Sequence, residues 1–488
     1  MTTLNRIQNP LADAAERFES GAQSARELAD AALKAAKANE HLAAFVDLDE
    51  DVVRRLAETV DAGPADGQTR GRVAGVPIAI SDTIVTDWGR SRAGSKMLGE
   101  YRSFFNAQVV DVLTQVGAVP FGKTNVSEMG LGHSTETSVF GPTRHPKHEG
   151  YLAGGAAGGA AAAVAAGIVP GALAVDTLGS LRQSAAHSGV VGLRPTYGAT
   201  SRRGVMALGS SFDSVGVITQ SVCDAAWLLA AIMGHDPWDG TSTRLPSEDV
   251  IMELKSGIRP LRVGIAPALM QLDMSEEVRA AVEASKAMLE ANGATIVDVD
   301  LPLAADFCPT AFALLHAEAS SNFSRYDGVR FGYRSERSDT IDDLYSFSRA
   351  EGFGEAVQEC ILLGTQLLSE ECYRSHYVRA QQLRRRIADD YQAAFANCDV
   401  ILGPVTPDTT PKLGAQPLDP IEAARLDRFT AGEALASLPA ISLPVGSSKQ
   451  GLPLAVQLSG APNSEATLLR AAYALEQLWA ADLAEKKS

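Results

Sequence analysis

A serine at the end of a glycine turn is the residue of this chain best suited to nucleophilic chemistry. Ser180 follows the apolar run Pro170–Val175, which has the length of a buried strand, and a turn that contains Gly179. On such a bend a hydroxyl projects outwards, and neighbouring backbone N–H groups can point at an oxyanion. We therefore predict that Ser180 is a nucleophile. A serine also needs a base, and the sequence around Ser180 offers no obvious lysine or Asp/His pair.

A glycine- and alanine-rich segment, residues 154–167, precedes this serine. It begins Gly-Gly-Ala-Ala-Gly-Gly and continues as an alanine run that ends at Gly167. Paired glycines let a backbone approach a substrate closely, and alanine favours helix. We therefore predict a loop and a helix that form the cradle of an active site. None of the side chains in this segment can transfer a proton.

Two histidines, His133 and His187, flank this cradle in the sequence. Either imidazole is a candidate base for Ser180 acting on an amide or an activated ester, as a hydrolase or an acyl transferase. A purely structural role is the alternative, and it is the commoner case for a histidine singled out by sequence alone. Both interpretations stay open at this point.

One segment, Gly117–Thr124, fits the P-loop pattern of nucleotide-binding proteins. A phosphate cradle is a loop of backbone N–H groups between a strand and a helix. Here the first glycine ends a predicted helix, and the residues after it are an apolar strand. We therefore treat the match as a chance one, with nucleotide binding kept as the weakest alternative.

Metal and cofactor sites are not expected. The chain has no HExxH pattern, and His145-Pro-Lys-His148 has no carboxylate or thiol at metal-ligand spacing. The five cysteines are scattered, odd in number and free of CxxC spacing, which argues against both a zinc site and a disulfide framework.

The elements that must position Ser180 repeat one arrangement of helix, glycine and strand. A predicted helix at 107–116 is followed by Gly117 and a strand at 118–121, and the same order recurs around Gly167 and Gly293. This repetition predicts an α/β fold, with a mixed central sheet covered by helices on both faces. Further strands are expected at 73–80, 295–299, 400–402, 440–445 and 454–458, and further helices at 275–292, 380–395 and 465–481.

The chain divides into four predicted regions. Residues 1–62 are an N-terminal helical segment, in which Ser24 and Glu27 have the spacing of a capping box. Residues 63–303 form the α/β core. Residues 304–398 are a helical insertion, since no convincing strand occurs there, and residues 399–488 return to the core.

Composition limits the classes of protein that this chain can be. Its 488 residues are 45% hydrophobic and 21% charged, as in globular proteins, and no stretch is apolar enough to span a membrane. The first ten residues lack the apolar region of a signal peptide, so a cytoplasmic location is expected. The net charge of −16 argues against direct nucleic-acid binding, which normally needs a basic face.

The segment from Gly75 to Tyr197 closely resembles the amidase signature family, and later segments extend the resemblance over most of the chain. Within the family, Arg325–Tyr333 is most similar to the A subunits of glutamine-dependent tRNA amidotransferases and related bacterial amidases. The motifs that carry the resemblance occur in the family's order: Gly-Val-Pro-Ile-Ala-Ile at 75–80, Gly-Lys-Thr-Asn at 122–125, Phe-Gly-Pro-Thr-Arg at 140–144, the cradle, Asp-Thr-x-Gly-Ser at 176–180, Gly-Leu-Arg-Pro-Thr-Tyr at 192–197 and Gly-Leu-Pro-Leu-x-Val-Gln at 451–457.

The resemblance implies a serine hydrolase that cleaves amide C–N bonds with a lysine, a bridging cis-serine and a nucleophilic serine. Ser180 occupies the nucleophile position, but Ser81 stands at the lysine position and Ala156 at the cis-serine position. The resemblance also implies an oxyanion hole formed by the backbone N–H groups of Thr177, Leu178, Gly179 and Ser180. Because two of the three catalytic groups are absent, we expect family-type catalysis to be lost and the chain to serve as a binding or scaffold subunit.

Ligand and partners also follow from the resemblance. Arg384 and Asp427 align with groups that bind a substrate's amino-acid end, and exposed helix charges are the alternative interpretation. The expected ligand is a small amide-like or acyl compound. The expected macromolecular partner is another subunit or a second copy of the chain.

Overall fold

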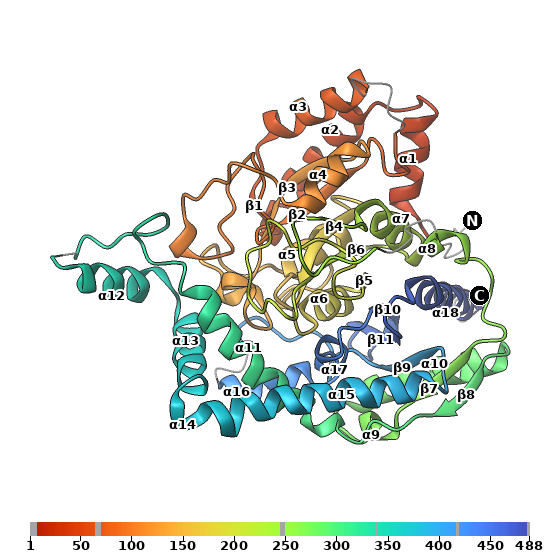
Figure 1. Ribbon diagram of the computed structural model, residues 1–488. Helices are drawn as coiled ribbons and strands as arrows, with labels where there is room; N and C mark the ends of the chain where they lie inside the picture. The colour runs from red at the N-terminus through yellow and green to blue at the C-terminus, as the bar shows by residue number, and fades with distance from the viewer. Residues whose placement is uncertain (1–6, 64–69, 245–248, 338, 416–418, 486–488) are drawn as a thin grey trace.

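The structure is a computed structural model that describes residues 7–63, 70–244, 249–337, 339–415 and 419–485. The predicted boundary between residues 62 and 63 lies next to residues 64–69, which are outside these ranges. Figure 1 shows a central sheet with helices packed around it and one helical arm that projects from the body.

Within the described residues, one mixed sheet of eleven strands forms the centre of the fold, in the order β1-β3-β2-β4-β6-β5-β10-β11-β9-β7-β8. The pairs β2–β3, β2–β4, β7–β8 and β7–β9 are parallel, and the other pairs are antiparallel. The predicted α/β fold with a mixed central sheet is confirmed. The strands are β1 (Phe45–Asp47), β2 (Pro77–Ser81), β3 (Val119–Thr124), β4 (Gly171–Asp176), β5 (Val191–Arg194), β6 (Ser214–Thr219), β7 (Arg262–Ile265), β8 (Thr295–Asp298), β9 (Val400–Pro404), β10 (Ala440–Ser447) and β11 (Pro453–Gly460).

Helices cover both faces of the sheet. Helices α5 and α6 pack on the sheet and on each other, as α7 and α18 do. The helices of the core are α1 (Pro10–Glu19), α2 (Ala25–Ala38), α3 (Glu50–Ala62), α4 (Gln108–Gln115), α5 (Gly158–Ala165), α6 (Ser180–Ser188), α7 (Val222–Ile232), α8 (Asp249–Met252), α9 (Pro267–Met270), α10 (Glu276–Ala291), α16 (Pro420–Ala424), α17 (Ala431–Leu435) and α18 (Glu465–Glu485). The predicted capping box is present at the start of α2, where Ser24 and Glu27 each bond the other's backbone N–H.

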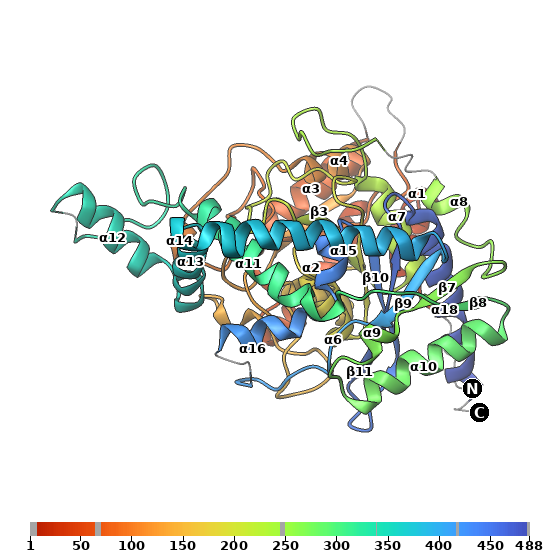
Figure 2. The same cartoon turned by 60° about the horizontal axis from the view of Figure 1, so that its bottom comes forward.

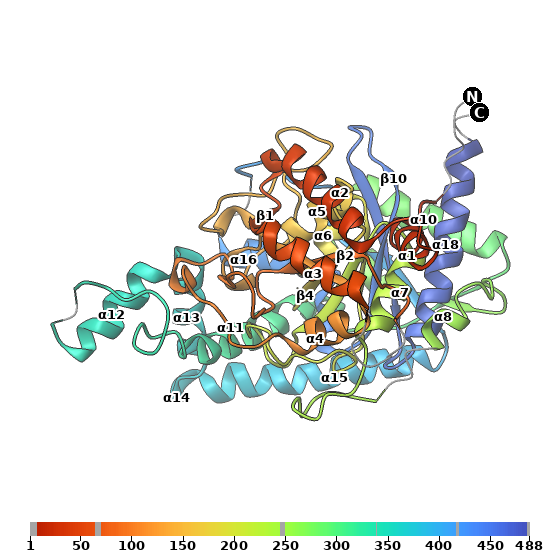
Figure 3. The ribbon, with the colours of Figure 1, turned by 90° about the horizontal axis from the view of Figure 1, so that it is seen from above.

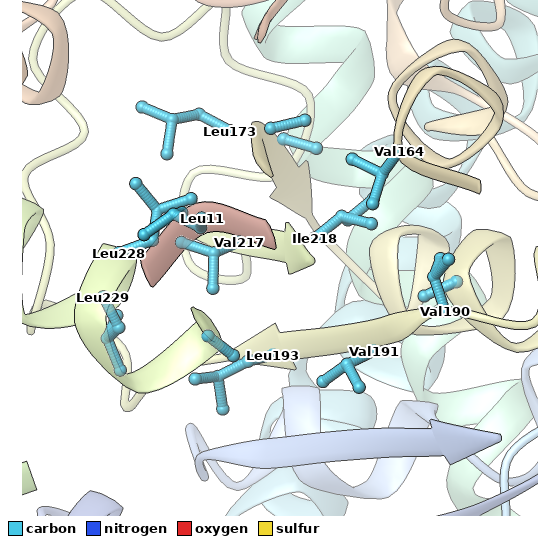
Figure 4. Close-up of a cluster of buried hydrophobic side chains, with 14 of the residues drawn as sticks. Leu11, Val164, Leu173, Val190, Val191, Leu193, Val217, Ile218, Leu228 and Leu229 are labelled. Carbon is cyan, nitrogen blue, oxygen red and sulfur yellow. The ribbon is translucent and has the colours of Figure 1, made fainter. Parts of the chain in front are cut away.

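Successive residues of the central strands point to opposite faces, as the period of a β-strand requires. Figure 4 shows Val217 of β6 beside Leu11 of α1 and Leu228 of α7, and it shows Ile218 beside Val164 of α5. All five of these side chains are fully buried. The sheet is therefore apolar on both sides, which explains why its strands read as continuous apolar runs in the sequence.

The described residues between β8 and β9 form helices, and no strand occurs among them. These helices are α11 (Phe307–Phe323), α12 (Ile341–Gly352), α13 (Glu355–Leu367), α14 (Glu370–Cys372) and α15 (Arg379–Phe395). Helix α12 stands away from the body in Figures 1 and 3, whereas α15 runs along it in Figure 2. Helices α11 and α13 pack side by side and lie next to the core.

Two details of the predicted elements were wrong. The N-terminal region is not wholly helical, because β1 lies between α2 and α3 and pairs with β3. This strand is an edge strand of three residues, too short to show a period in the sequence. The strand expected at 73–80 begins only at Pro77, which supplies no N–H group and is tolerated at the first residue of a strand.

Candidate active site

Ser180 is the first residue of α6, immediately after the turn that leaves β4. The turn depends on Gly179, whose φ is +119° and whose missing Cβ would lie 2.2 Å from the Thr430 hydroxyl oxygen. The Ser180 hydroxyl donates a hydrogen bond of 3.1 Å to the carbonyl oxygen of Val175. The N-terminus of a helix favours negative charge, so this position suits an anionic intermediate.

A buried network of ion pairs around Asp176 stabilises this turn. Asp176, the last residue of β4, accepts hydrogen bonds from Arg182 (Nε to Oδ2, 3.1 Å) and Arg194 (Nη1 to Oδ1, 2.9 Å). All three side chains are fully inaccessible to solvent. Burial alone raises the pKa of the Asp176 carboxyl, but the two guanidinium charges outweigh burial and hold that pKa below its usual value. The carboxylate is therefore ionised and fixes both ends of the turn.

Ser81, Ala156 and Ser180 line one small void of about 20 Å³. Ser81 ends β2, is 1% exposed, and shares a hydrogen bond of 3.0 Å with the hydroxyl of Thr83. Ala156 lies in the loop before α5, and its methyl group can neither donate nor accept a proton. The structure thus brings together three residues that lie far apart in the sequence, and none of the lining side chains of this void is a lysine, a histidine or a carboxylate.

A buried lysine lies on the strand next to Ser81, but it points elsewhere. The ammonium of Lys123 donates to the carbonyl oxygen of Ile84 and, over 2.9 Å, to the hydroxyl of Ser91. Burial lowers its pKa to about 8. Lys123 does not line the void beside Ser180, so it is not placed to act as a base for that hydroxyl.

The environment of Lys123 also shows that the P-loop pattern at residues 117–124 is a chance match. Residues 119–124 of the matching segment form β3, and Lys123 is fully buried inside the protein. A strand has no concave set of N–H groups for a phosphate, and the ammonium group is already bonded to protein oxygens. Segment 117–124 therefore has no phosphate cradle.

His187 lies on α6 two turns after Ser180, about 10 Å further along the helix axis at 1.5 Å per residue. Burial, together with the charges of His145 and His133, lowers the pKa of its imidazole to about 4. Its ring packs against Gly154, where a Cβ would lie 2.5 Å from the ring carbon Cδ2. The structure therefore gives His187 a packing role and no hydrogen bond to Ser180.

We expect His187→Phe to reduce the acid sensitivity of the fold. The folded pKa of about 4 lies below the usual unfolded value of about 6.5, so stability is lost as the pH falls from 6.5 towards 4. At pH 5 this loss amounts to about 2 kcal/mol for His187. The free energy of unfolding, measured in urea at pH 7.5 and pH 5.0, should fall by that much less in the variant. His41→Phe, at an exposed histidine, is the control, and equal pH dependence of His187→Phe and the natural chain would contradict the prediction.

His133 is paired with Asp427, 294 residues away in the sequence. Its Nε2 lies 2.9 Å from Oδ1 of Asp427, which also accepts a hydrogen bond of 2.9 Å from Gln183. Burial opposes protonation of this imidazole, but the charge of Asp427 and the hydrogen bond to it raise the pKa of His133 above its usual value. Among the described residues, neither histidine forms a hydrogen bond with Ser180.

The His133–Asp427 pair and Ser180 line a second and much larger cavity, of about 890 Å³. Its walls come from the turn before α6, the loop at 128–137, helices α11 and α13, and the segment around α16. Figure 2 shows α11, α13 and α16 close together at one end of the molecule. Sequence reasoning missed the residues that the helical insertion supplies to this cavity, among them Cys308, Phe312, His316 and Glu359. No local motif marks them, because only the tertiary contact of the insertion with the core brings them to Ser180.

Arg384 does not line this cavity. Its Nη2 donates to the carbonyl oxygen of Ser211 over 2.8 Å, its Nε donates to Leu435 over 2.9 Å, and its guanidinium lies 4.4 Å from the ring centre of Phe212. Asp427 therefore lines the same cavity as Ser180, whereas Arg384 lies outside it and bonds to Ser211 and Leu435.

Within the described ranges, no three His, Cys, Asp or Glu side chains are grouped so that they could hold a metal ion. Over the same ranges, no helix is both long and apolar enough to cross a membrane.

Comparison with known proteins identifies the family. The Amidase family model matches residues 27–469. The A subunit of the glutamyl-tRNA(Gln) amidotransferase of Aromatoleum aromaticum is 44% identical over 441 residues, which are 89% of this chain and 90% of that protein. The crystal structure of the corresponding A subunit from Thermotoga maritima superposes with a TM-score of 0.79 at 32% identity, and covers 98% of this chain and 96% of its own. The native peptide amidase from Stenotrophomonas maltophilia superposes with the same TM-score at 29% identity, over 96% of each chain.

These matches confirm the resemblance that the motifs from Gly75 to Gln457 indicated. The match of the family model and the 44% identity both extend over nearly the whole chain, including the helical insertion. The chain belongs to the amidase family.

Proposed function

We propose that this amidase-family chain has lost amide hydrolysis by the lysine–serine–serine relay and acts as a ligand-binding or scaffold subunit. The observation that carries the proposal is the small void that Ser81, Ala156 and Ser180 line together. In the proposed assignment Ser81 stands for the lysine and Ala156 for the bridging serine. A serine hydroxyl cannot act as a terminal base near neutral pH, and an alanine cannot relay a proton.

The size of the expected loss follows from the way such groups act. The members of a catalytic triad act as a unit, and removal of one commonly lowers the rate by on the order of four to six decades. The helix N-terminus at Ser180 and the proposed oxyanion hole formed by the N–H groups of residues 177–180 still favour a bound acyl or amide oxygen. Loss of proton transfer with retention of these groups supports binding without turnover.

Assembly with a partner is the second part of the proposal. Relatives at 40–44% identity are named as the A subunit of an amidotransferase. A chain that keeps this fold but loses its relay can still hold a partner in position. We therefore propose that this chain assembles with a partner protein or with a second copy of itself.

The test is a comparison of the natural chain with Ser180→Ala. Hydrolysis of simple amides, nitroanilides and glutamine is measured at enzyme concentrations high enough to detect on the order of one part in 10⁵ of an ordinary amidase rate. We expect the natural chain and the Ser180→Ala variant to hydrolyse these substrates equally slowly, with no hydrolysis that depends on Ser180. Turnover that disappears in Ser180→Ala would refute the proposal.

A second candidate function rests on the His133–Asp427 pair. A carboxylate that orients an imidazole is the arrangement that supports a serine nucleophile in other hydrolases, and both groups share a cavity with Ser180. The Ser180 hydroxyl would have to leave the Val175 carbonyl oxygen to reach His133. In the same assay with an activated ester, turnover that is lost in both Ser180→Ala and His133→Ala would favour this alternative.

A further inference from the structure

The ionisable side chains that line the large cavity beside Ser180 are mostly acidic. Five carboxylates line it, and none of its lining residues is a lysine or an arginine. Only two lining side chains, His133 and His316, can carry positive charge. His133 is already paired with Asp427, and burial lowers the pKa of His316. The carboxylates are Glu128, Glu136, Glu355, Glu359 and Asp427.

Three of these carboxylates have partners in the protein. Glu128 accepts hydrogen bonds from the hydroxyl of Ser95 and the backbone N–H of Gly354. Glu136 accepts from the N–H of Gly414 over 2.6 Å. The donors to Glu128 and Glu136 are neutral and do not cancel a negative charge, while burial raises the pKa of the Glu128 carboxyl. The third carboxylate, Asp427, is paired with His133.

The other two carboxylates belong to one face of α13. Glu355 and Glu359 are four residues apart, which places them one turn apart on the side of the helix that faces the cavity. Glu359 is half-buried, and neither side chain has an ion pair or a hydrogen bond to the described residues. Two negative charges on one wall repel each other, and a cation between the wall and the cavity relieves that repulsion.

Apolar side chains line another part of the cavity, close to Ser180. Leu178, Leu208, Phe312 and Leu315 line the cavity between the nucleophile turn and α11. A volume of about 890 Å³ is that of a site for a drug-sized ligand rather than for a single small amide. A ligand that fills this cavity therefore meets the helix N-terminus at Ser180, an apolar middle and the carboxylates of α13.

We infer that this cavity binds an amide or acyl compound that carries an ammonium group, with the carbonyl at Ser180, an apolar chain against α11 and the ammonium at Glu359. A ligand with a free carboxylate finds no cationic side chain in the lining except His133, since the guanidinium of Arg384 is bonded elsewhere. The inference rests on the proposed function in so far as both take this cavity as the ligand site.

The test compares three probes of equal length on the full chain. They are an ω-amino alkanamide, the neutral alkanamide and the ω-carboxy alkanamide, each with five to nine carbons and measured by calorimetry in 50 mM salt, where screening is weak. We expect the ammonium probe of the best length to bind at least tenfold more tightly than the carboxylate probe. Glu359→Gln should weaken only the ammonium probe, by roughly fivefold, as for a partly exposed ion pair.

The matched control is Glu290→Gln, at an exposed position of α10 that does not line the cavity, and it should leave all affinities unchanged. Equal or tighter binding of the carboxylate probe, no effect of Glu359→Gln on the ammonium probe, or no binding of any probe up to 10 mM would overturn the inference. The affinities are measured without turnover. A failure of this inference can therefore be told apart from a failure of the proposed function, because only Ser180-dependent turnover refutes the proposed function.

Discussion

Replacement of Ser81 by lysine together with Ala156→Ser is expected to give this chain an amidase activity that depends on Ser180. In the structure Ser81, Ala156 and Ser180 line one void, so the two substitutions place a base and a bridging hydroxyl beside the nucleophile. We expect the rate of amide hydrolysis to rise by at least about 10³-fold over the natural chain. Because such groups act as a unit, Ser81→Lys or Ala156→Ser alone should give little or none of this gain.

Space for the lysine is the main physical obstacle. The void of about 20 Å³ holds about one water molecule, which is less than a lysine side chain requires. Met129 and Met206 line the void, and unbranched methionines adapt readily to a changed neighbour. If the double variant unfolds below room temperature, Met206→Ala should be added to make room.

Hydrolysis of a nitroanilide and of a simple aliphatic amide measures the outcome, with thermal unfolding as the check on folding. Ser180→Ala in the double variant should abolish the new activity. A folded double variant without Ser180-dependent hydrolysis would show that Ser81 and Ala156 are not the positions of the lost relay.

Asp176→Asn is expected to destabilise the fold by about 3–5 kcal/mol, the usual cost of removing one partner of a buried ion pair. The substitution keeps the shape of the side chain and removes its charge. Arg182 and Arg194 are both fully buried and would then lack their shared carboxylate. The midpoint of urea unfolding should fall while the slope of the transition stays constant.

Asp30→Asn is the matched control for this prediction. Asp30 also pairs with two arginines, Arg26 and Arg54, but its side chain is 43% exposed. Exposed pairs are worth about 1 kcal/mol or less, so the control should barely move the midpoint. Equal effects of the two substitutions would contradict the prediction, because the buried network would then contribute no more to stability than an exposed ion pair.

The parts of the site that sequence could predict are local ones. The strand, the glycine turn and Ser180 lie within ten residues of one another, and each has its own pattern. Context also decided the P-loop match correctly, since Gly117 follows α4 and residues 119–124 form β3. Apolar strands and capped helices are dictated by neighbours in the chain, which is why most elements of the sheet were found.

The parts that sequence could not predict depend on contacts between distant segments. Asp427 and His133 lie 294 residues apart, and no sequence pattern around either residue predicts that they pair. Asp176 and Arg182 are close in sequence, yet charged residues are usually exposed, so nothing marks this pair as buried. The packing of α11 and α13 beside the core decides which of their polar residues reach Ser180.

The contacts around the turn before α6 can form only late in synthesis, because several of their partners lie far towards the C-terminus. Arg182 is bonded to Gln457, which lies 275 residues later, and Thr430 donates to the carbonyl oxygen of Leu178, 252 residues earlier. At 5–20 residues per second a ribosome needs roughly 14–55 s to make the intervening 275 residues. Throughout that interval the nascent chain carries Arg182 without its bond to Gln457. The turn that holds Ser180 is thus among the last parts of this protein to reach its final contacts.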